Sequence, residues 1–152
     1  MRCIRAILLL ATATTLASCD GTGLDAARDL TGTWEGSGPT GASYTDNVAN
    51  PNCAYEADIR IVFVQSGTSL TGSFTLTVTS STKLLSTNLS CVPVGASNNE
   101  ALFGSVNSSD VTFELFNTRT EFDGTFTSDI LNATFTSTLP GGIMGTMRVT
   151  RQ

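Results

Sequence analysis

Histidine is absent from all 152 residues of this sequence, and charged residues make up only 14% of it. The absence of histidine removes the commonest general base, the commonest metal ligand and the usual pH switch. A serine–histidine relay is therefore excluded, and tryptophan occurs once, at Trp34. These shortages lead us to expect a protein without catalytic activity and without a cofactor.

Low charge, together with many threonine, valine and phenylalanine residues, favours strands over helices. The length is sufficient for one domain with a substantial core. The formal net charge of −5 makes nucleic acid an unfavourable partner, because acidic side chains and phosphates repel each other. The composition therefore predicts one acidic, all-β domain that does not bind nucleic acid.

Residues 1–18 are typical of an export signal. Residues 1–5 contain two arginines, and residues 6–17 form an apolar run that is too short to span a bilayer. The sequence Leu16-Ala17-Ser18-Cys19 resembles the lipobox of bacterial lipoproteins. This resemblance implies cleavage before Cys19 and attachment of lipid, palmitate included, to its thiol and amine. An ordinary signal peptide with a chance cysteine is the alternative.

The lipobox resemblance implies a membrane-anchored lipoprotein of the bacterial cell envelope, facing the periplasm or the cell exterior. Residues 19–29 are then a lipid-anchored tether, and residues 30–152 form the β-domain. Loss of residues 1–18 removes two arginines and no acidic residue, so the formal net charge falls from −5 to −7. The expected partners are the membrane, through lipid on Cys19, and either a small hydrophobic ligand or another envelope protein.

Two cysteines remain if Cys3 leaves with the signal and Cys19 is acylated. Cys53 and Cys91 are then an even pair in an oxidising compartment, where disulfides persist. We expect a disulfide between them, with free buried thiols as the alternative. Two cysteines without a histidine do not complete a four-ligand metal site, so we expect no metal there.

A five-residue motif recurs along the domain: an apolar residue, any residue, glycine, serine or threonine, and another apolar residue. Side chains alternate along a strand, so each copy places its glycine between two apolar residues on one face. A glycine within a strand marks a bend or the close approach of another backbone. The motif therefore indicates inward-facing glycines that allow a small barrel to curl, namely Gly32, Gly72, Gly104, Gly124 and Gly145.

Alternation with a period of two predicts eight strands. One face of these strands is apolar, and closing the sheet on itself covers that face and removes both edges. We therefore expect one antiparallel up-and-down meander closed into a small barrel of about eight strands. Residues 38–54 and 81–99 are interpreted as long loops, the second with or without a short strand. The predicted strands are 30–37, 55–65, 70–80, 100–106, 111–116, 121–127, 130–139 and 143–151.

Both long loops follow odd-numbered strands, so they are expected at the same end of the barrel. Cys53 lies in the first loop and Cys91 in the second. The expected disulfide would therefore link two loops at one mouth.

The segment Leu30-Thr31-Gly32-Thr33-Trp34 opens this threonine-rich meander and resembles the start of calycins, the lipocalin-like and avidin-like barrels. Lipocalins carry Gly-x-Trp on their first strand, and an arginine near the last strand packs on that tryptophan. The resemblance implies that Arg148 or Arg151 makes this contact with Trp34 through a cation–π interaction.

Eight large apolar side chains are expected to point into the barrel. If they fill it, the protein is a solid scaffold that serves as a binding or interaction module. If they line a cavity, the protein is a lipocalin-like carrier of a small hydrophobic molecule, which is the second hypothesis. These residues are Trp34, Phe63, Phe74, Leu76, Phe113, Phe122, Phe126 and Phe135.

Two pairs of carboxylates share a strand face, Glu56 with Asp58 and Glu121 with Asp123. Both pairs alternate with residues expected inside, so we expect them to face solvent. A glycosidase-type acid pair is one alternative. Calcium bound by the first pair or by residues 46–47 is another.

Overall fold

The computed structural model describes residues 29–47, 50–86 and 88–152. The proposed signal, Cys19 and the tether up to residue 28 lie outside the described residues. No helix among the described residues is long and apolar enough to cross a bilayer. The elements are β1 (Gly32–Gly36), α1 (Gly38–Gly41), β2 (Ala42–Asp46), β3 (Cys53–Ser66), β4 (Ser69–Lys83), β5 (Ser97–Asn107), β6 (Asp110–Leu115), β7 (Thr120–Phe126), β8 (Ile130–Ser137) and β9 (Ile143–Arg151).

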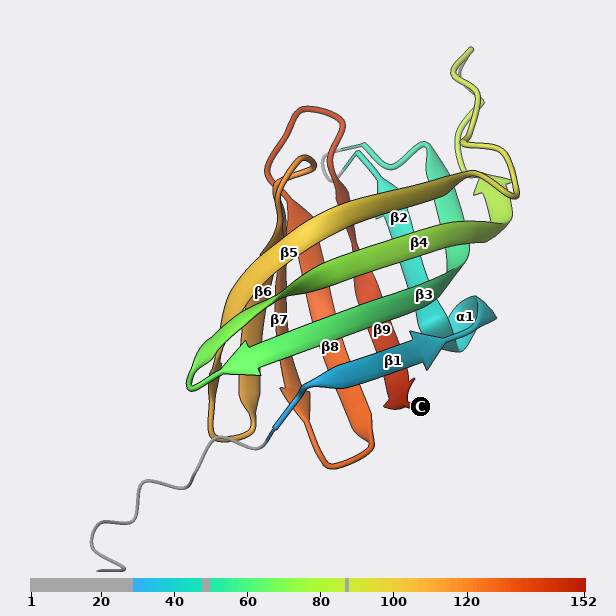
Figure 1. Cartoon of the computed structure of the whole chain (residues 1–152). Helices are drawn as coiled ribbons and strands as arrows, with labels where there is room; N and C mark the ends of the chain where they lie inside the picture. The colour runs from blue at the N-terminus through green and yellow to red at the C-terminus, as the bar shows by residue number, and fades with distance from the viewer. Residues whose placement is uncertain (1–28, 48–49, 87) are drawn as a thin grey trace, which may run out of the picture.

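The strands form a closed, eight-stranded antiparallel barrel, as predicted (Figure 1). Strands β3 to β9 follow one another around the ring, and β2 closes it by pairing with both β3 and β9. The ninth strand, β1, lies outside this ring and pairs with β3 at residues 59–63 and with β9 at 150–151. The apolar face is thereby enclosed without a covering helix.

The predicted loop 38–54 is wrong in part, because this segment contains α1, β2 and the start of β3. Pro39 lies in the first turn of α1, and Gly38 adopts a φ of +56°, so the chain turns sharply there. Ala42 and Tyr44 then return to the inner face of the barrel. With only two inward residues in five, β2 shows too little alternation to stand out among the surrounding turn-forming residues.

The glycines of the repeated motif lie on the inner face of their strands. In β7, Gly124 stands between the buried Phe122 and Phe126. A Cβ atom on Gly124 would overlap the backbone of β8, and Gly72, Gly104 and Gly145 face adjacent backbone in the same way. The space that these four glycines leave is therefore occupied by the backbone of the adjacent strand.

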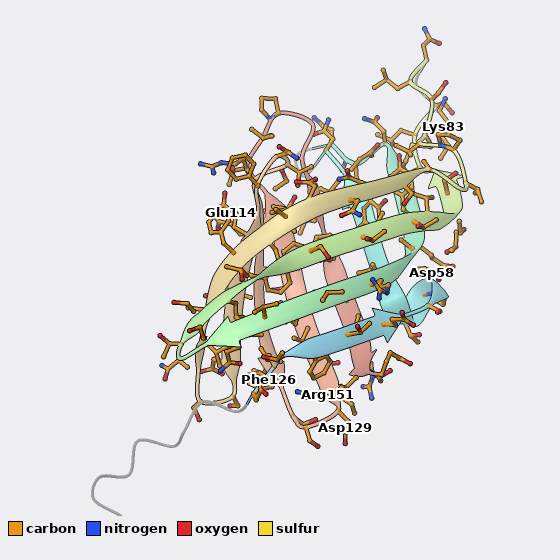
Figure 2. All side chains as sticks on the ribbon, viewed as in Figure 1. Asp58, Lys83, Glu114, Phe126, Asp129 and Arg151 are labelled. Atoms are coloured by element: carbon orange, nitrogen blue, oxygen red, sulfur yellow. A yellow bond between two sulfur atoms is a disulfide. The ribbon has the colours of Figure 1, made fainter. Side chains whose placement is uncertain are left out.

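One end of the barrel is packed and the other is open. At the end that carries the turns 67–68, 108–109 and 127–129, large apolar side chains fill the interior; this is the closed end. The other end, the mouth, carries the described parts of the loops 47–52 and 84–96 and the loops 116–119 and 138–142. The side chains that fill the closed end include Leu30, Trp34, Phe63, Leu70, Val106, Val111, Leu131 and Val149. Figure 2 labels Phe126 at this end of the barrel, near Arg151 and Asp129.

The predicted disulfide between Cys53 and Cys91 is present, with 5.8 Å between the Cα atoms. Cys53 is the first residue of β3 and not part of a loop, whereas Cys91 lies in the loop 84–96. The bond therefore ties this loop to the wall of the barrel at the mouth.

Candidate binding site at the mouth of the barrel

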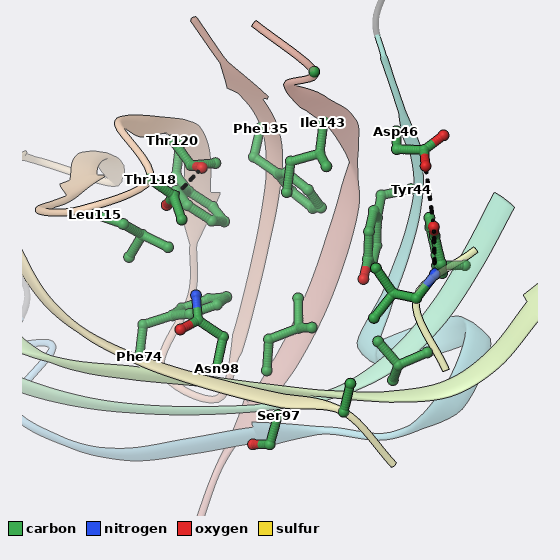
Figure 3. Close-up of a pocket in the computed structure, with 17 residues that line it drawn as sticks. Tyr44, Asp46, Phe74, Ser97, Asn98, Leu115, Thr118, Thr120, Phe135 and Ile143 are labelled. Carbon is green, nitrogen blue, oxygen red and sulfur yellow. Dashed lines mark hydrogen bonds between the residues drawn. The ribbon is translucent and has the colours of Figure 1, made fainter. Parts of the chain in front are cut away.

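A pocket of about 390 Å³ opens at the mouth and reaches toward the middle of the barrel (Figure 3). Cavities of this size are within the range that holds small organic ligands. Its wall is mainly apolar, because inward-facing residues of the strands meet there. The aromatic members are Tyr44, Tyr55, Phe74, Phe122 and Phe135, and the aliphatic members include Leu76, Val78, Leu115 and Ile143.

The eight side chains expected inside the barrel divide between its two halves. Trp34, Phe63 and Phe126 are buried toward the closed end, and Phe113 is buried between the halves. The half toward the mouth remains hollow, and its lining includes Phe74, Leu76, Phe122 and Phe135. The interior is thus packed at one end and open at the other, a combination that neither of the two hypotheses described.

A continuous series of aromatic contacts links the packed half to the mouth. Phe113 meets the ring of Phe63 edge-on, with 5.5 Å between the centroids, and stacks on Phe122 at 4.4 Å. Phe122 stacks on Phe135 with 5.0 Å between the ring centroids, and the centroids of Phe135 and Tyr44 are 6.0 Å apart. Because each ring supports the next, the floor and wall of the pocket are held by the core itself.

Asp46 and Tyr55 organise the polar side of the mouth. The Asp46 carboxylate accepts hydrogen bonds from the backbone N–H groups of Cys53 and Asn52, at 2.8 and 3.2 Å. Its other oxygen accepts a hydrogen bond from the Tyr55 hydroxyl at 3.0 Å. The Tyr55 oxygen in turn accepts from the backbone N–H of Val92 at 3.1 Å. This chain of bonds and the disulfide hold the loop 84–96 against the pocket.

Tyr44 contributes a hydroxyl without a partner. The residue is only 8% exposed and lines the pocket, yet its hydroxyl makes no hydrogen bond to any described residue. Burial raises the pKa of Tyr44 to about 12, with smaller contributions from Tyr55 and Asp46, so the phenol is protonated at neutral pH. The hydroxyl oxygen itself is open to the pocket and not enclosed by protein, so it can donate or accept a hydrogen bond with a ligand there.

Glu100 is a buried carboxylate next to the pocket, 4% exposed. It accepts hydrogen bonds from the side-chain amide of Asn98, which lines the pocket, and from the backbone N–H groups of Asn117 and Thr118 at 2.9 and 3.0 Å. Burial alone would raise the pKa of Glu100, but these hydrogen bonds outweigh burial and hold the pKa below its ordinary value. Glu100 is therefore ionised at neutral pH.

Sequence reasoning missed Tyr44 and Glu100. Glu100 stands two residues before Leu102 and four before Gly104, so strand alternation already placed it on the inner face. Tyr44 was hidden because β2 falls within the segment interpreted as a loop. Asp46 was considered only as a calcium ligand.

The two arginines named as candidate partners of Trp34 have different positions. The guanidinium carbon of Arg151 lies 4.8 Å from the centroid of the Trp34 ring. Arg148 is exposed on the outer face of β9. The contact between Trp34 and Arg151 belongs to the closed end and takes no part in the pocket.

The paired carboxylates lie away from the pocket. Asp58, Glu121 and Asp123 are exposed on the outer face, and Glu56 is half-buried there. Asp58 accepts a hydrogen bond from the backbone N–H of Gly38 at 2.8 Å. Within the described ranges, no group of three or more histidine, cysteine, aspartate or glutamate residues could hold a metal ion.

Large apolar side chains are exposed around the mouth. They are Leu84, Leu85, Leu89, Val92, Val94, Phe116 and Leu139, with exposed fractions of 45 to 62%. An apolar molecule approaching the pocket therefore meets an apolar rim. The mouth thus combines this rim, an aromatic wall, one free hydroxyl and two carboxylates.

No protein-family model, curated protein or solved structure matches the chain.

Proposed function

We propose that this protein binds a small, largely apolar molecule in the pocket at the mouth of its barrel. The observation that carries the proposal is the cavity of about 390 Å³, which has an aromatic wall and the unpartnered hydroxyl of Tyr44, an otherwise buried residue. A solid scaffold would need no such space, because packing it would bury more apolar surface. The hollow mouth therefore favours the lipocalin-like carrier over the interaction module.

The proposal is for binding without catalysis. The hydroxyl groups of Thr118 and Thr120 are hydrogen-bonded to each other at 3.0 Å. The hydroxyl of Tyr55 is committed to Asp46. None of these hydroxyls is paired with a free base that would activate it as a nucleophile.

We also propose that lipid on Cys19 holds the protein at a membrane of the bacterial envelope. The support is the lipobox resemblance, together with the position at which the described chain begins. The N–H of Leu30 donates to the side chain of Gln65 at 2.8 Å, near the β3–β4 turn of the closed end. The described chain therefore enters the barrel at the end opposite the mouth. Replacing Cys19 with serine should release the protein from membrane fractions, and continued membrane association would refute the anchor.

Binding can be tested with a neutral apolar dye whose fluorescence rises on leaving water. Ala96 lines the pocket, so Ala96→Trp should fill the mouth and weaken dye binding by about tenfold or more. Thr68→Trp is the matched control, because Thr68 is exposed in the turn at the closed end. Circular dichroism would check that both variants fold. Unchanged dye binding by a folded Ala96→Trp variant would refute the pocket as the binding site.

A further inference from the structure

We infer that the pocket selects a positively charged apolar molecule, an amine in its ammonium form, over uncharged and carboxylate-bearing molecules of the same shape. This inference rests on the proposed function and adds the charge of the ligand to it.

The first argument is the sign of the charge around the pocket. No lysine or arginine is among the residues that line it, whereas Asp46 does line it. Glu100, buried just behind, is hydrogen-bonded to the lining residue Asn98. The groups that hydrogen-bond to these two carboxylates are neutral amides and one phenol. Charges interact more strongly in a partly dry pocket than in water, so this site attracts a cation and repels an anion.

The second argument is the aromatic character of the pocket wall. Five aromatic rings line the pocket, and the faces of such rings attract cations. An ammonium group at the mouth would therefore find rings and a carboxylate together. A fatty acid would instead bring its carboxylate toward Asp46.

The third argument is the hydroxyl of Tyr44. It belongs to a residue that is more than nine-tenths buried, and its ring stands on the pocket wall between Phe135 and the Asp46–Tyr55 pair (Figure 3). The phenol oxygen can accept a hydrogen bond from an ammonium N–H. This places the charged end of the ligand at the mouth and its apolar part over Phe122, deeper in the barrel.

The test compares three ligands of one chain length: octylamine, octanol and octanoate. Each is titrated at neutral pH against the protein loaded with the neutral dye, and its dissociation constant is taken from the displacement. We expect octylamine to bind about tenfold more tightly than octanol, and octanoate to bind more weakly than octanol. If octanol or octanoate binds as tightly as octylamine, the charge selectivity is wrong and the apolar pocket stands. If neither the dye nor any of the three binds, the proposed function itself fails.

Two variants and one control locate the residues responsible for the selectivity. Asp46→Asn removes one negative charge with little change in shape and should reduce the preference for octylamine over octanol to about threefold or less. Asp110→Asn makes the same charge change at an exposed residue of the closed end and should leave the preference unchanged. Tyr44→Phe should weaken octylamine binding by about threefold to tenfold. An unchanged preference in Asp46→Asn, or an equal loss in Asp110→Asn, would overturn the assignment.

Discussion

The guanidinium carbon of Arg151 lies 4.8 Å from the centroid of the Trp34 ring and so joins β9, the last strand of the barrel, to β1, the strand outside the ring. The same guanidinium donates to the backbone carbonyls of Thr31 and Asp29. The indole N–H of Trp34 donates to the carbonyl of Leu30 at 2.9 Å. These contacts hold β1 and β9 together at the closed end, opposite the pocket.

Arg151→Ala should therefore destabilise the fold and leave the pocket intact. Loss of the cation–π contact and of the hydrogen bonds should lower the free energy of unfolding by about 2 kcal/mol. Urea denaturation measures this change, and dye binding should stay at the wild-type level. Arg148→Ala is the control, since that arginine is exposed on the same strand and its loss should cost under about 0.5 kcal/mol. Equal effects of the two variants would contradict the role given to Arg151.

Gly104→Ala tests the close approach of neighbouring strands. A Cβ at this position would overlap the carbonyl oxygen of Thr112 and the backbone of Phe113 on β6. The strands would have to separate, and we expect a loss of about 2 kcal/mol in the free energy of unfolding. Ser105→Ala changes the next, exposed residue and should cost about 0.5 kcal/mol or less. A neutral Gly104→Ala variant would show that the strand spacing is adjustable.

Glu100→Gln should remove part of the acid sensitivity of the protein. Because the pKa of Glu100 is lower in the folded state, its carboxylate stabilises the fold above the unfolded pKa. This contribution is lost as the pH falls through the folded pKa. A glutamine side chain keeps one acceptor oxygen and gains an NH2 donor, so it no longer accepts from Asn98, Asn117 and Thr118 together. We therefore expect a loss of about 2 kcal/mol at about pH 7.

Between about pH 6 and pH 3, the stability of Glu100→Gln should fall less than that of the wild type. Denaturation curves across this range measure the difference. Glu121→Gln is the matched control, because Glu121 is exposed on the outer face, and its curve should follow the wild type. Parallel curves for the wild type and Glu100→Gln would contradict the assignment.

The disulfide should contribute to both stability and binding. Closing a loop across 38 residues of sequence separation stabilises the folded state by about 4 kcal/mol in the chain-entropy description. Replacing Cys53 and Cys91 by alanine should lower the stability by about this amount. It should also weaken dye binding, because the middle of the loop 84–96 would lose its covalent tie to β3. Hydrogen bonds would then hold the loop: the bond from Val92 to Tyr55, and backbone bonds near the two ends of the loop. Full dye affinity without the disulfide would show that this loop does not shape the pocket.

Much of the fold was predictable because its signals are local. Strand alternation needs only neighbouring residues, as in Phe74, Leu76 and Val78 against the intervening threonines. The closing of the sheet into a barrel follows from the need to cover the apolar face of the strands. β2 escaped prediction because its pairing with β9, Tyr44 opposite Gly145, is distant in sequence.

By itself, the sequence determined that the protein is an antiparallel barrel with inward aromatic residues and a disulfide at one end. Only the tertiary structure decided that the barrel is packed around Trp34 and hollow beside Tyr44. The reason is physical: alternation assigns a side chain to the inner face, but the space left there depends on how side chains from many strands pack together. The unpartnered Tyr44 hydroxyl and the nearby carboxylates of Asp46 and Glu100 become a site only through that packing.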